Sequence, residues 1–136
     1  MCGIVGVFDA RQRASVSKEV LLRMTECLLH RGPDDQGVFV SQEEGVGLGH
    51  TRLSIIDLSL LGHQPMANST KTLWITFNGE IYNFQEIRTE LQKRGRKFKS
   101  GSATEVILEA YEEWGMESVS RFRGMFAFAL WAAGAR

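Results

Sequence analysis

Several features that mark particular classes of protein are scarce or missing in this sequence. Its 136 residues include only two prolines and two cysteines, Cys2 and Cys27, which is too few for the disulfide framework of a small secreted protein. No stretch approaches the roughly 20 apolar residues that cross a bilayer. The apolar start, residues 1–8, lacks a basic leader and is interrupted by Asp9, unlike a signal peptide. We therefore expect a cytoplasmic chain with no membrane partner.

An excess of charge of one sign is also missing. Lysine and arginine together number 16, as do aspartate and glutamate, so the formal net charge is zero. Proteins that bind nucleic acids through the phosphate backbone carry a basic excess, so we expect no nucleic-acid partner. The hydrophobic fraction of 43% and the charged fraction of 24% are ordinary for a folded domain, and the length allows one domain.

Motifs for metals and nucleotides are absent as well. The three histidines, His30, His50 and His63, have no metal-ligand spacing with one another or with the cysteines. The 14 glycines form neither a phosphate-binding loop nor the dinucleotide-binding pattern at a strand–helix junction. We therefore expect no metal ion and no cofactor in this chain.

Local patterns predict a mixture of strands and helices, which indicates an α+β fold with helices covering antiparallel sheet. Short apolar runs rich in β-branched or aromatic residues predict strands. Apolar residues at helical spacing after a polar cap predict helices that end near glycine. Cys27 is expected in the core, and residues 59–71 are expected to be a long loop. Residues 125–131 are expected to be a buried strand, with a strongly apolar helix turn as the alternative. The predicted strands are Gly3–Phe8 and residues 37–40, 46–53 (with 54–58 as a candidate extension), 73–77 and 125–131, and the predicted helices cover residues 18–29, 83–95 and 102–114.

Cys2 is the most informative residue. If the initiator methionine is removed, as is common before a small residue, Cys2 carries both a thiol and a free α-amine. With reference pKa values of about 8.5 for the thiol and about 7.7–8.0 for the amine, the amine can act as the general base for the thiol, directly or through a water molecule. One residue would then supply both nucleophile and base. The alternative is a small buried cysteine at the head of a strand.

Two further motifs could serve such a nucleophile. The amide of Asn78 and the N–H of Gly79, directly after the strand over 73–77, are suitable donors to an oxyanion, although Asn-Gly also favours an ordinary turn. Arg52 ends another predicted strand, and its guanidinium can bind a carboxylate through two hydrogen bonds. A surface salt bridge is the alternative role for Arg52.

Several longer motifs follow one another along the chain. They are MCGIVG at residues 1–6, HRGPDDQG at 30–37, GHTRLSIIDLS at 49–59, GHQPM at 62–66, FNGEIYN at 77–83, TEVILEAYEEWG at 104–115 and GMFAFALW at 124–131. In this order they resemble the glutaminase domain of class II glutamine amidotransferases, which are N-terminal-nucleophile hydrolases. Within that class the chain is most similar to glutamine-hydrolysing asparagine synthetases, because the sugar-phosphate aminotransferase branch would show Arg-Gly-Tyr-Asp at residues 31–34.

The resemblance implies a fold and roles for the site residues. The family fold is a four-layer α/β/β/α sandwich, with two antiparallel sheets between helical layers. Cys2, once N-terminal, would attack the side-chain amide of glutamine, and Asn78 with the N–H of Gly79 would form the oxyanion hole. Water would then release glutamate, and ammonia would pass to a second site. The implied glutamine-binding residues are Arg52 for the α-carboxylate, Glu80 for the α-amino end, and the backbone of Leu53, Ser54, Ile55 and Ile56.

Two departures from the family pattern leave the activity open. Ala103 stands where the family has an aspartate that pairs with the substrate ammonium. The chain also ends at Arg136, before the later strands of similar domains and before an ATP-dependent synthetase domain. We therefore expect a C-terminally truncated glutaminase domain over residues 1–136, with the synthetase domain fused or encoded separately and with ATP and magnesium implied only for that domain. The alternatives are a glutaminase module for an asparagine-synthetase-like amidation and a non-catalytic or weakly active remnant with a binding or regulatory role.

The end of the sequence at Arg136 also affects what is expected of the last predicted strand. The strand over 125–131 is expected to be an inner strand whose next neighbour is missing, and an unpaired apolar edge favours self-association. The sequence leaves open which carboxylate receives the ammonia, aspartate or another.

Overall fold

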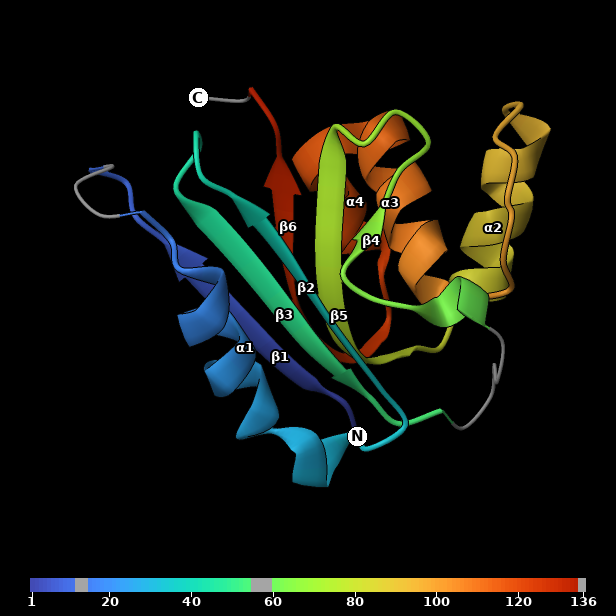
Figure 1. Cartoon of the computed structure of the whole chain (residues 1–136). Helices are drawn as coiled ribbons and strands as arrows, with labels where there is room; N and C mark the ends of the chain where they lie inside the picture. The colour runs from blue at the N-terminus through green and yellow to red at the C-terminus, as the bar shows by residue number, and fades with distance from the viewer. Residues whose placement is uncertain (12–14, 55–59, 135–136) are drawn as a thin grey trace.

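Two antiparallel three-stranded sheets form the centre of the molecule (Figure 1). The computed structural model describes residues 1–11, 15–54 and 60–134. Each sheet has a central strand with one neighbour on either side, so that residues far apart in the sequence become adjacent. The first sheet has the order β1 (Gly3–Phe8), β3 (Val46–Arg52), β2 (Asp35–Ser41), and the second has the order β4 (Met66–Ala67), β5 (Leu73–Ile81), β6 (Gly124–Ala132).

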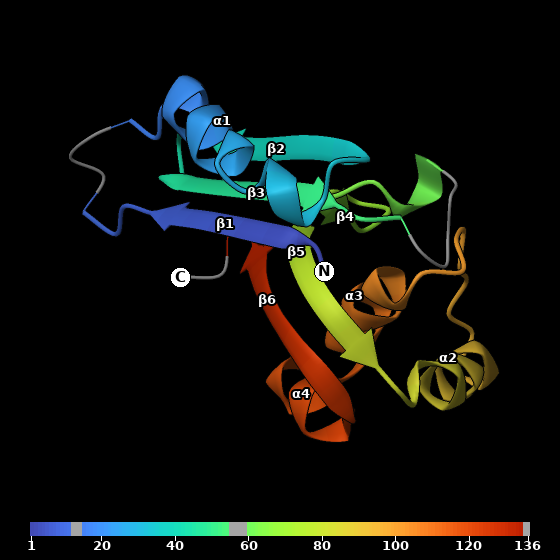
Figure 2. The same cartoon turned by 90° about the horizontal axis from the view of Figure 1, so that it is seen from below.

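Helices cover the outer face of each sheet, which gives the molecule four layers (Figure 2). The helix α1 (Lys18–Glu26) contacts all three strands of the first sheet, and α3 (Ala103–Trp114) lies on β5 with α2 (Phe84–Lys93) and the short α4 (Ser118–Arg121) beside it. The strands β1 and β3 contact β5 between the two helical layers. This arrangement confirms the α+β fold of α/β/β/α type. In the described part of the chain no helix is long and apolar enough to cross a bilayer.

The predicted elements are present, and the differences lie mainly at their ends. The helix predicted over 18–29 ends at Glu26, and a 3-10 turn, Leu29–Arg31, follows it. The strand predicted over 73–77 continues to Ile81 because its pairing with β6 continues. The segment 59–71 is not all loop, since it contains a 3-10 turn, Leu60–Gly62, and β4. Residues 55–59, and with them most of the candidate extension over 54–58, lie outside the described part of the chain.

The larger hydrophobic core lies between the second sheet and its helices. Ile75 on β5, Leu91 on α2 and Val106 on α3 are fully buried there, and burial of such a side chain is worth about 1.5–3 kcal/mol. On the other side of the molecule α1 buries Leu21 and Thr25 against the first sheet. Cys27 lies just past the end of α1 and is exposed, so its expected place in the core is wrong.

The strand β6 lies at the edge of its sheet, where it pairs with β5 alone among the described strands. None of its residues is fully buried, so the expectation that the strand over 125–131 is buried is wrong, whereas its unpaired edge agrees with the expected missing neighbour. An edge strand presents a row of unpaired N–H and C=O groups, which is a template for pairing with another chain.

We expect a polypeptide of these 136 residues to self-associate through the free edge of β6. Sedimentation velocity over a range of concentrations would show larger species as the concentration rises. The substitution Met125→Lys places a charge at an exposed position of the strand, and a charge on an edge strand opposes such pairing, so it should reduce the association. A wild-type chain that stays monomeric at every concentration would contradict this prediction.

Candidate active site

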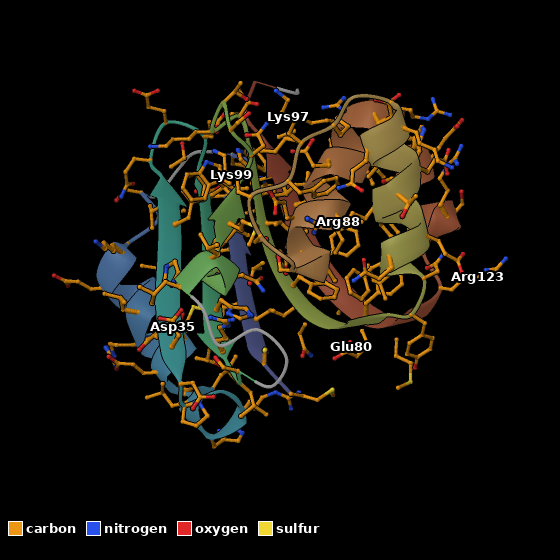
Figure 3. The ribbon with its side chains drawn as sticks, turned by 90° about the vertical axis from the view of Figure 1, so that its right-hand side faces the viewer. Asp35, Glu80, Arg88, Lys97, Lys99 and Arg123 are labelled. Carbon is orange, nitrogen blue, oxygen red and sulfur yellow. The ribbon has the colours of Figure 1, made fainter. Side chains whose placement is uncertain are left out.

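A pocket of about 240 Å³ opens where the N-terminus, the end of β3, the second half of β5 and the start of α3 meet. These four segments are distant in the sequence, and the two sheets bring them together. Figure 3 shows Glu80 of β5 and Asp35 of β2 on this side of the molecule. Ile55 and Ile56 lie outside the described part of the chain. The expected site residues that line the pocket are Cys2, Arg52, Leu53, Ser54, Asn78, Gly79, Glu80 and Ala103.

The thiol of Cys2 is held at the end of β3. Because β1 pairs with β3 so that Gly3 lies opposite Thr51, Cys2, the residue before β1, lies close to Leu53. The N–H of Leu53 points at the sulfur at 3.4 Å, and the Nε of Arg31 donates to the backbone carbonyl of Cys2 at 3.1 Å. Cys2 is half-buried and lines the pocket, so it is not a core cysteine at the head of a strand.

Asn78 and Gly79 lie inside β5 and not in a turn after it. They pair with Ala127 and Phe126 of β6, which corrects the expectation that the strand ends at Phe77. Gly79 has a φ of 147°, and a Cβ built on it would lie 2.3 Å from the carbonyl oxygen of Met125. This position therefore favours glycine for both conformation and space. The pairing of β5 with β6 on both sides of this point holds the Asn78 amide at the pocket more firmly than a loop would.

Arg52 is the last residue of β3, and only 9% of its surface is exposed. The backbone of Gly62 packs directly against its guanidinium, since a Cβ on Gly62 would lie 2.2 Å from Nη2 of Arg52. A guanidinium held in this way can bind a carboxylate through two parallel hydrogen bonds. Its burial at the pocket is unlike that of an exposed surface salt bridge, and the binding of a carboxylate by Arg52 stays a prediction.

The start of α3 is a well-built helix cap that borders the pocket. The hydroxyl of Ser102 accepts the N–H of Glu105 at 3.3 Å. The carboxylate of Glu105 accepts the N–H groups of Lys99 and Ser100, each at 2.7 Å. Ala103 is the first residue of the helix and lines the pocket. Its methyl group offers no hydrogen-bond acceptor at the positive end of the helix dipole.

Gln64 is a site residue that the sequence analysis did not identify. Its side-chain oxygen accepts the N–H of Phe77 at 2.7 Å, and its side-chain nitrogen donates to the hydroxyl of Thr104 at 3.2 Å. Gln64 therefore ties β5 to the start of α3, so that the residues at the two sides of the pocket keep a fixed distance. In the sequence, the feature that points to Gln64 as a candidate site residue is its position in the GHQPM motif over residues 62–66.

His50 lies between the two sheets and is 1% exposed. Its Nε2 donates to the carbonyl oxygen of Phe77 at 3.1 Å, which places the proton on Nε2 and leaves Nδ1 unprotonated. Burial lowers the pKa of His50 to about 4, against the opposing effects of this hydrogen bond and of Asp35. The ring is therefore neutral at pH 7 and joins the first sheet to β5.

The burial of the neutral His50 ring predicts that the protein becomes less stable as the pH falls. The unfolded chain takes up a proton near the ordinary pKa of 6.5, whereas the folded chain does so only near 4. The free energy of unfolding should therefore decrease as the pH falls from about 6.5 to 4, with about 3 kcal/mol lost through this residue. Urea unfolding of the wild type and of His50→Gln, which keeps an N–H donor, should show a shallower decrease for the variant. The exposed His30 provides the control His30→Gln, and equal slopes for the wild type and His50→Gln would refute the prediction.

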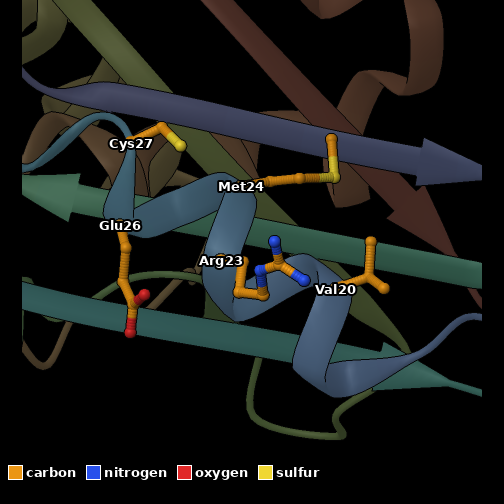
Figure 4. A pocket seen from close by; sticks show the side chains of 5 residues that line it. All are labelled: Val20, Arg23, Met24, Glu26 and Cys27. Atoms are coloured by element: carbon orange, nitrogen blue, oxygen red, sulfur yellow. The ribbon is translucent and has the colours of Figure 1, made fainter.

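A second hollow has a different lining. A larger hollow of about 630 Å³ lies along the exposed side of α1 (Figure 4). It is lined by Val20, Arg23, Met24, Glu26 and Cys27 and contains none of the expected site residues. Within residues 1–11, 15–54 and 60–134, no group of three or more histidine, cysteine, aspartate or glutamate side chains is placed to hold a metal ion.

Comparison with known proteins identifies the family. Residues 1–136, the whole chain, match the glutamine amidotransferase domain family. The chain therefore belongs to this family, which confirms the resemblance stated from the motifs.

The similar curated proteins are much longer than this chain. Asparagine synthetase [glutamine-hydrolyzing] 1 of Bacillus subtilis (strain 168) is 46% identical over 133 residues, which cover 96% of this chain and 21% of that protein. Asparagine synthetase B [glutamine-hydrolyzing] of Escherichia coli (strain K12) is 44% identical over 131 residues, which cover 96% of this chain and 23% of that protein. The chain thus spans about a fifth of the length of these relatives.

Two solved structures share the fold. Glutamine phosphoribosylpyrophosphate (PRPP) amidotransferase from B. subtilis, complexed with ADP and GMP, superposes with a TM-score of 0.78 at 18% identity, over 95% of this chain and 35% of that one. A structure described as the allosteric regulatory enzyme of purine biosynthesis gives a TM-score of 0.80 at 19% identity, with the same coverage of 95% and 35%. At these identities the likeness concerns the fold alone.

Proposed function

We propose that this domain hydrolyses the side-chain amide of glutamine to glutamate and ammonia. The observation that carries the proposal is the meeting of Cys2, Arg52 and the Asn78–Gly79 pair in one pocket. A nucleophile, an anchor for a carboxylate and donors for an oxyanion are the parts that hydrolysis of an amino-acid amide needs. The asparagine synthetase relatives, whose names include glutamine hydrolysis, support the same activity.

The chemistry begins once removal of Met1 makes Cys2 the N-terminal residue. The sulfur attacks the side-chain amide carbon, and the thiol proton passes to the α-amine of Cys2. The negative charge that develops on the amide oxygen is stabilised by Asn78 and the N–H of Gly79. The carbon–nitrogen bond then breaks, the proton moves from the amine to the leaving nitrogen, and ammonia departs. Water attacks the resulting thioester with the amine as base, which releases glutamate and restores the thiol.

The pocket also supplies contacts for the amino-acid end of glutamine. The guanidinium of Arg52 binds the α-carboxylate, with backbone groups of Leu53 and Ser54 beside it. Glu80, which also lines the pocket, interacts with the α-ammonium. For Ile55 and Ile56, which follow Ser54, the same backbone role stays a prediction.

We further propose that the ammonia serves an ATP-dependent amidation of aspartate or another carboxylate. The relatives are full-length synthetases of which this chain spans about a fifth, so a synthetase domain, fused or separate, is the proposed partner. ATP and magnesium belong to that domain. The cytoplasmic location stays a prediction.

A second candidate is a weakly active or non-catalytic remnant that acts as a binding or regulatory module. Ala103 favours it, because a residue without an acceptor lines the glutamine pocket at the start of α3. Cys2, Asn78 and Gly79 favour hydrolysis instead, since all three line the same pocket.

The first experiment follows glutamine labelled with nitrogen-15 in the amide. The protein is incubated with it, and intact mass spectrometry establishes beforehand that Met1 has been removed. We expect equal amounts of glutamate and labelled ammonia, whereas binding of glutamine without any release of ammonia would favour the remnant.

A further inference from the structure

Segment 62–64 touches the pocket through its first and third residues. Gly62 lies against the guanidinium of Arg52, and Gln64 binds both Phe77 and Thr104. The residue between them, His63, does not line the pocket. Its Nδ1 donates a hydrogen bond to the carboxylate of Asp35 at 2.6 Å. The segment is therefore held from the other side by a contact outside the pocket lining.

The strand pairing explains why Asp35 is in a position to hold this segment. Asp35 lies directly opposite Arg52 in the register of β2 and β3, so one strand pair carries both the pocket guanidinium and the partner of His63. Two residues further along β2, Gly37 leaves room for the segment. A Cβ there would lie 2.2 Å from the carbonyl oxygen of Gln64 and 2.8 Å from the ring of His63.

We propose that Asp35 and His63 are positioning residues that keep the Gly62 backbone against Arg52 and so hold the Arg52 guanidinium in the orientation that binds the α-carboxylate of an amino acid. The proposal rests on the proposed function, because it concerns affinity for glutamine. In the sequence, His63 was a candidate only for a metal site, which its spacing does not support, and Asp35 had no predicted role.

The exposure of the pair separates this role from a contribution to global stability. The side chain of His63 is 49% exposed and that of Asp35 is 27% exposed, and exposed ion pairs contribute little to the free energy of unfolding. Loss of the pair should therefore leave the fold intact and change only the local order of segment 62–64.

Steady-state kinetics of the processed protein provide the first test. We expect His63→Ala to raise the KM for glutamine about tenfold, because a partly lost carboxylate contact weakens substrate and transition state equally. The kcat should stay within about twofold of the wild type for the same reason. A residue with a merely structural role would instead lower the amount of folded protein, and so kcat, at unchanged KM.

Matched variants sharpen the test. His63→Asn keeps an N–H donor close to the place of Nδ1 and should restore most of the affinity. Asp35→Ala should resemble His63→Ala, and the double variant should be no worse than either, because the two residues act through one contact. Glu90→Ala removes another exposed ion-pair partner, on α2 and outside the pocket lining, and should change neither constant.

A second readout does not depend on catalysis. The nitrogen-15 NMR signal of the Arg52 side-chain Nε–H reports the order of the guanidinium, and we expect it to shift or broaden in His63→Ala but not in Glu90→Ala. An unchanged KM and an unchanged Arg52 signal in a folded His63→Ala protein would overturn the inference. A wild type that neither binds nor hydrolyses glutamine would overturn the proposed function instead, and the Arg52 signal alone would then decide whether the pair positions this residue.

Discussion

Replacing Cys2 with alanine is expected to reduce the kcat for glutamine hydrolysis by roughly 10,000-fold or more, the range seen when a nucleophile is removed from a preorganised site. In the proposed mechanism the sulfur of Cys2 forms the covalent intermediate, and no other residue that lines the pocket carries a thiol. Binding of glutamine should survive, because Arg52 and Glu80 are unchanged. The measurement is single-turnover release of ammonia, together with calorimetric binding of glutamine to the variant.

The chain provides a matched control for this prediction. Cys27 is also a free cysteine, and it is exposed on the far side of the first sheet beside α1. Cys27→Ala should therefore keep the wild-type activity. A glutamine-like electrophile should label the wild type and Cys27→Ala once each, in competition with glutamine. Labelling of Cys2→Ala that glutamine still blocks would show that another residue is the nucleophile.

The sequence predicted well those strands and helices whose bounds depend on neighbouring residues in the chain. The strand Gly3–Phe8 and the helix Ala103–Trp114 have the predicted bounds within a residue, because an apolar run, a serine cap and a terminal glycine depend only on neighbouring residues. Cys27 was misplaced because apolar spacing gives the buried face of a helix but not the point where the helix stops. The helix α1 ends at Glu26, and Cys27 follows it.

Sheet pairing, which joins distant residues, explains the other errors. The prediction ended the strand at Phe77 because Asn-Gly favours turns, yet nine residues of β5 pair with β6, and this pairing overrides the local preference. The incomplete burial of β6 likewise follows from its place at the edge of a sheet and not from its apolar sequence.

The site residues divide in the same way. The residues that are proposed to carry the chemistry, Cys2, Arg52 and the Asn78–Gly79 pair, could be named as candidates from their functional groups and motifs alone. Gln64 and the Asp35–His63 pair were missed because they act by linking segments. Their importance follows from hydrogen bonds between residues that lie 13 to 40 positions apart in the chain. A single sequence does not show which of its distant residues come into contact.

Ala103→Asp is expected to strengthen glutamine binding by tens to a few thousand-fold, seen as a fall in KM with little change in kcat. Ala103 lines the pocket as the first residue of α3, so a carboxylate there can face the α-ammonium of the bound amino acid. One buried partner of a charged group is worth roughly 2–5 kcal/mol, and about 1.4 kcal/mol corresponds to a factor of ten in affinity. Glu80 also serves the ammonium, which places the expected gain toward the lower end of this range.

The effect should be on binding rather than on folding. An acidic residue in the first turn of a helix stabilises it by about 0.3–1 kcal/mol through the helix dipole, so the thermal midpoint of Ala103→Asp should be equal to or slightly above that of the wild type.

Ala103→Asn is the control, because its amide has nearly the same shape and an acceptor oxygen but no charge. If the charge on residue 103 matters, KM falls much more for aspartate than for asparagine, and the difference disappears for a glutamine analogue without the α-amino group. If kcat/KM of a folded, processed Ala103→Asp protein equals that of the wild type, residue 103 is not part of the ammonium site, and Glu80 alone provides the negative charge there.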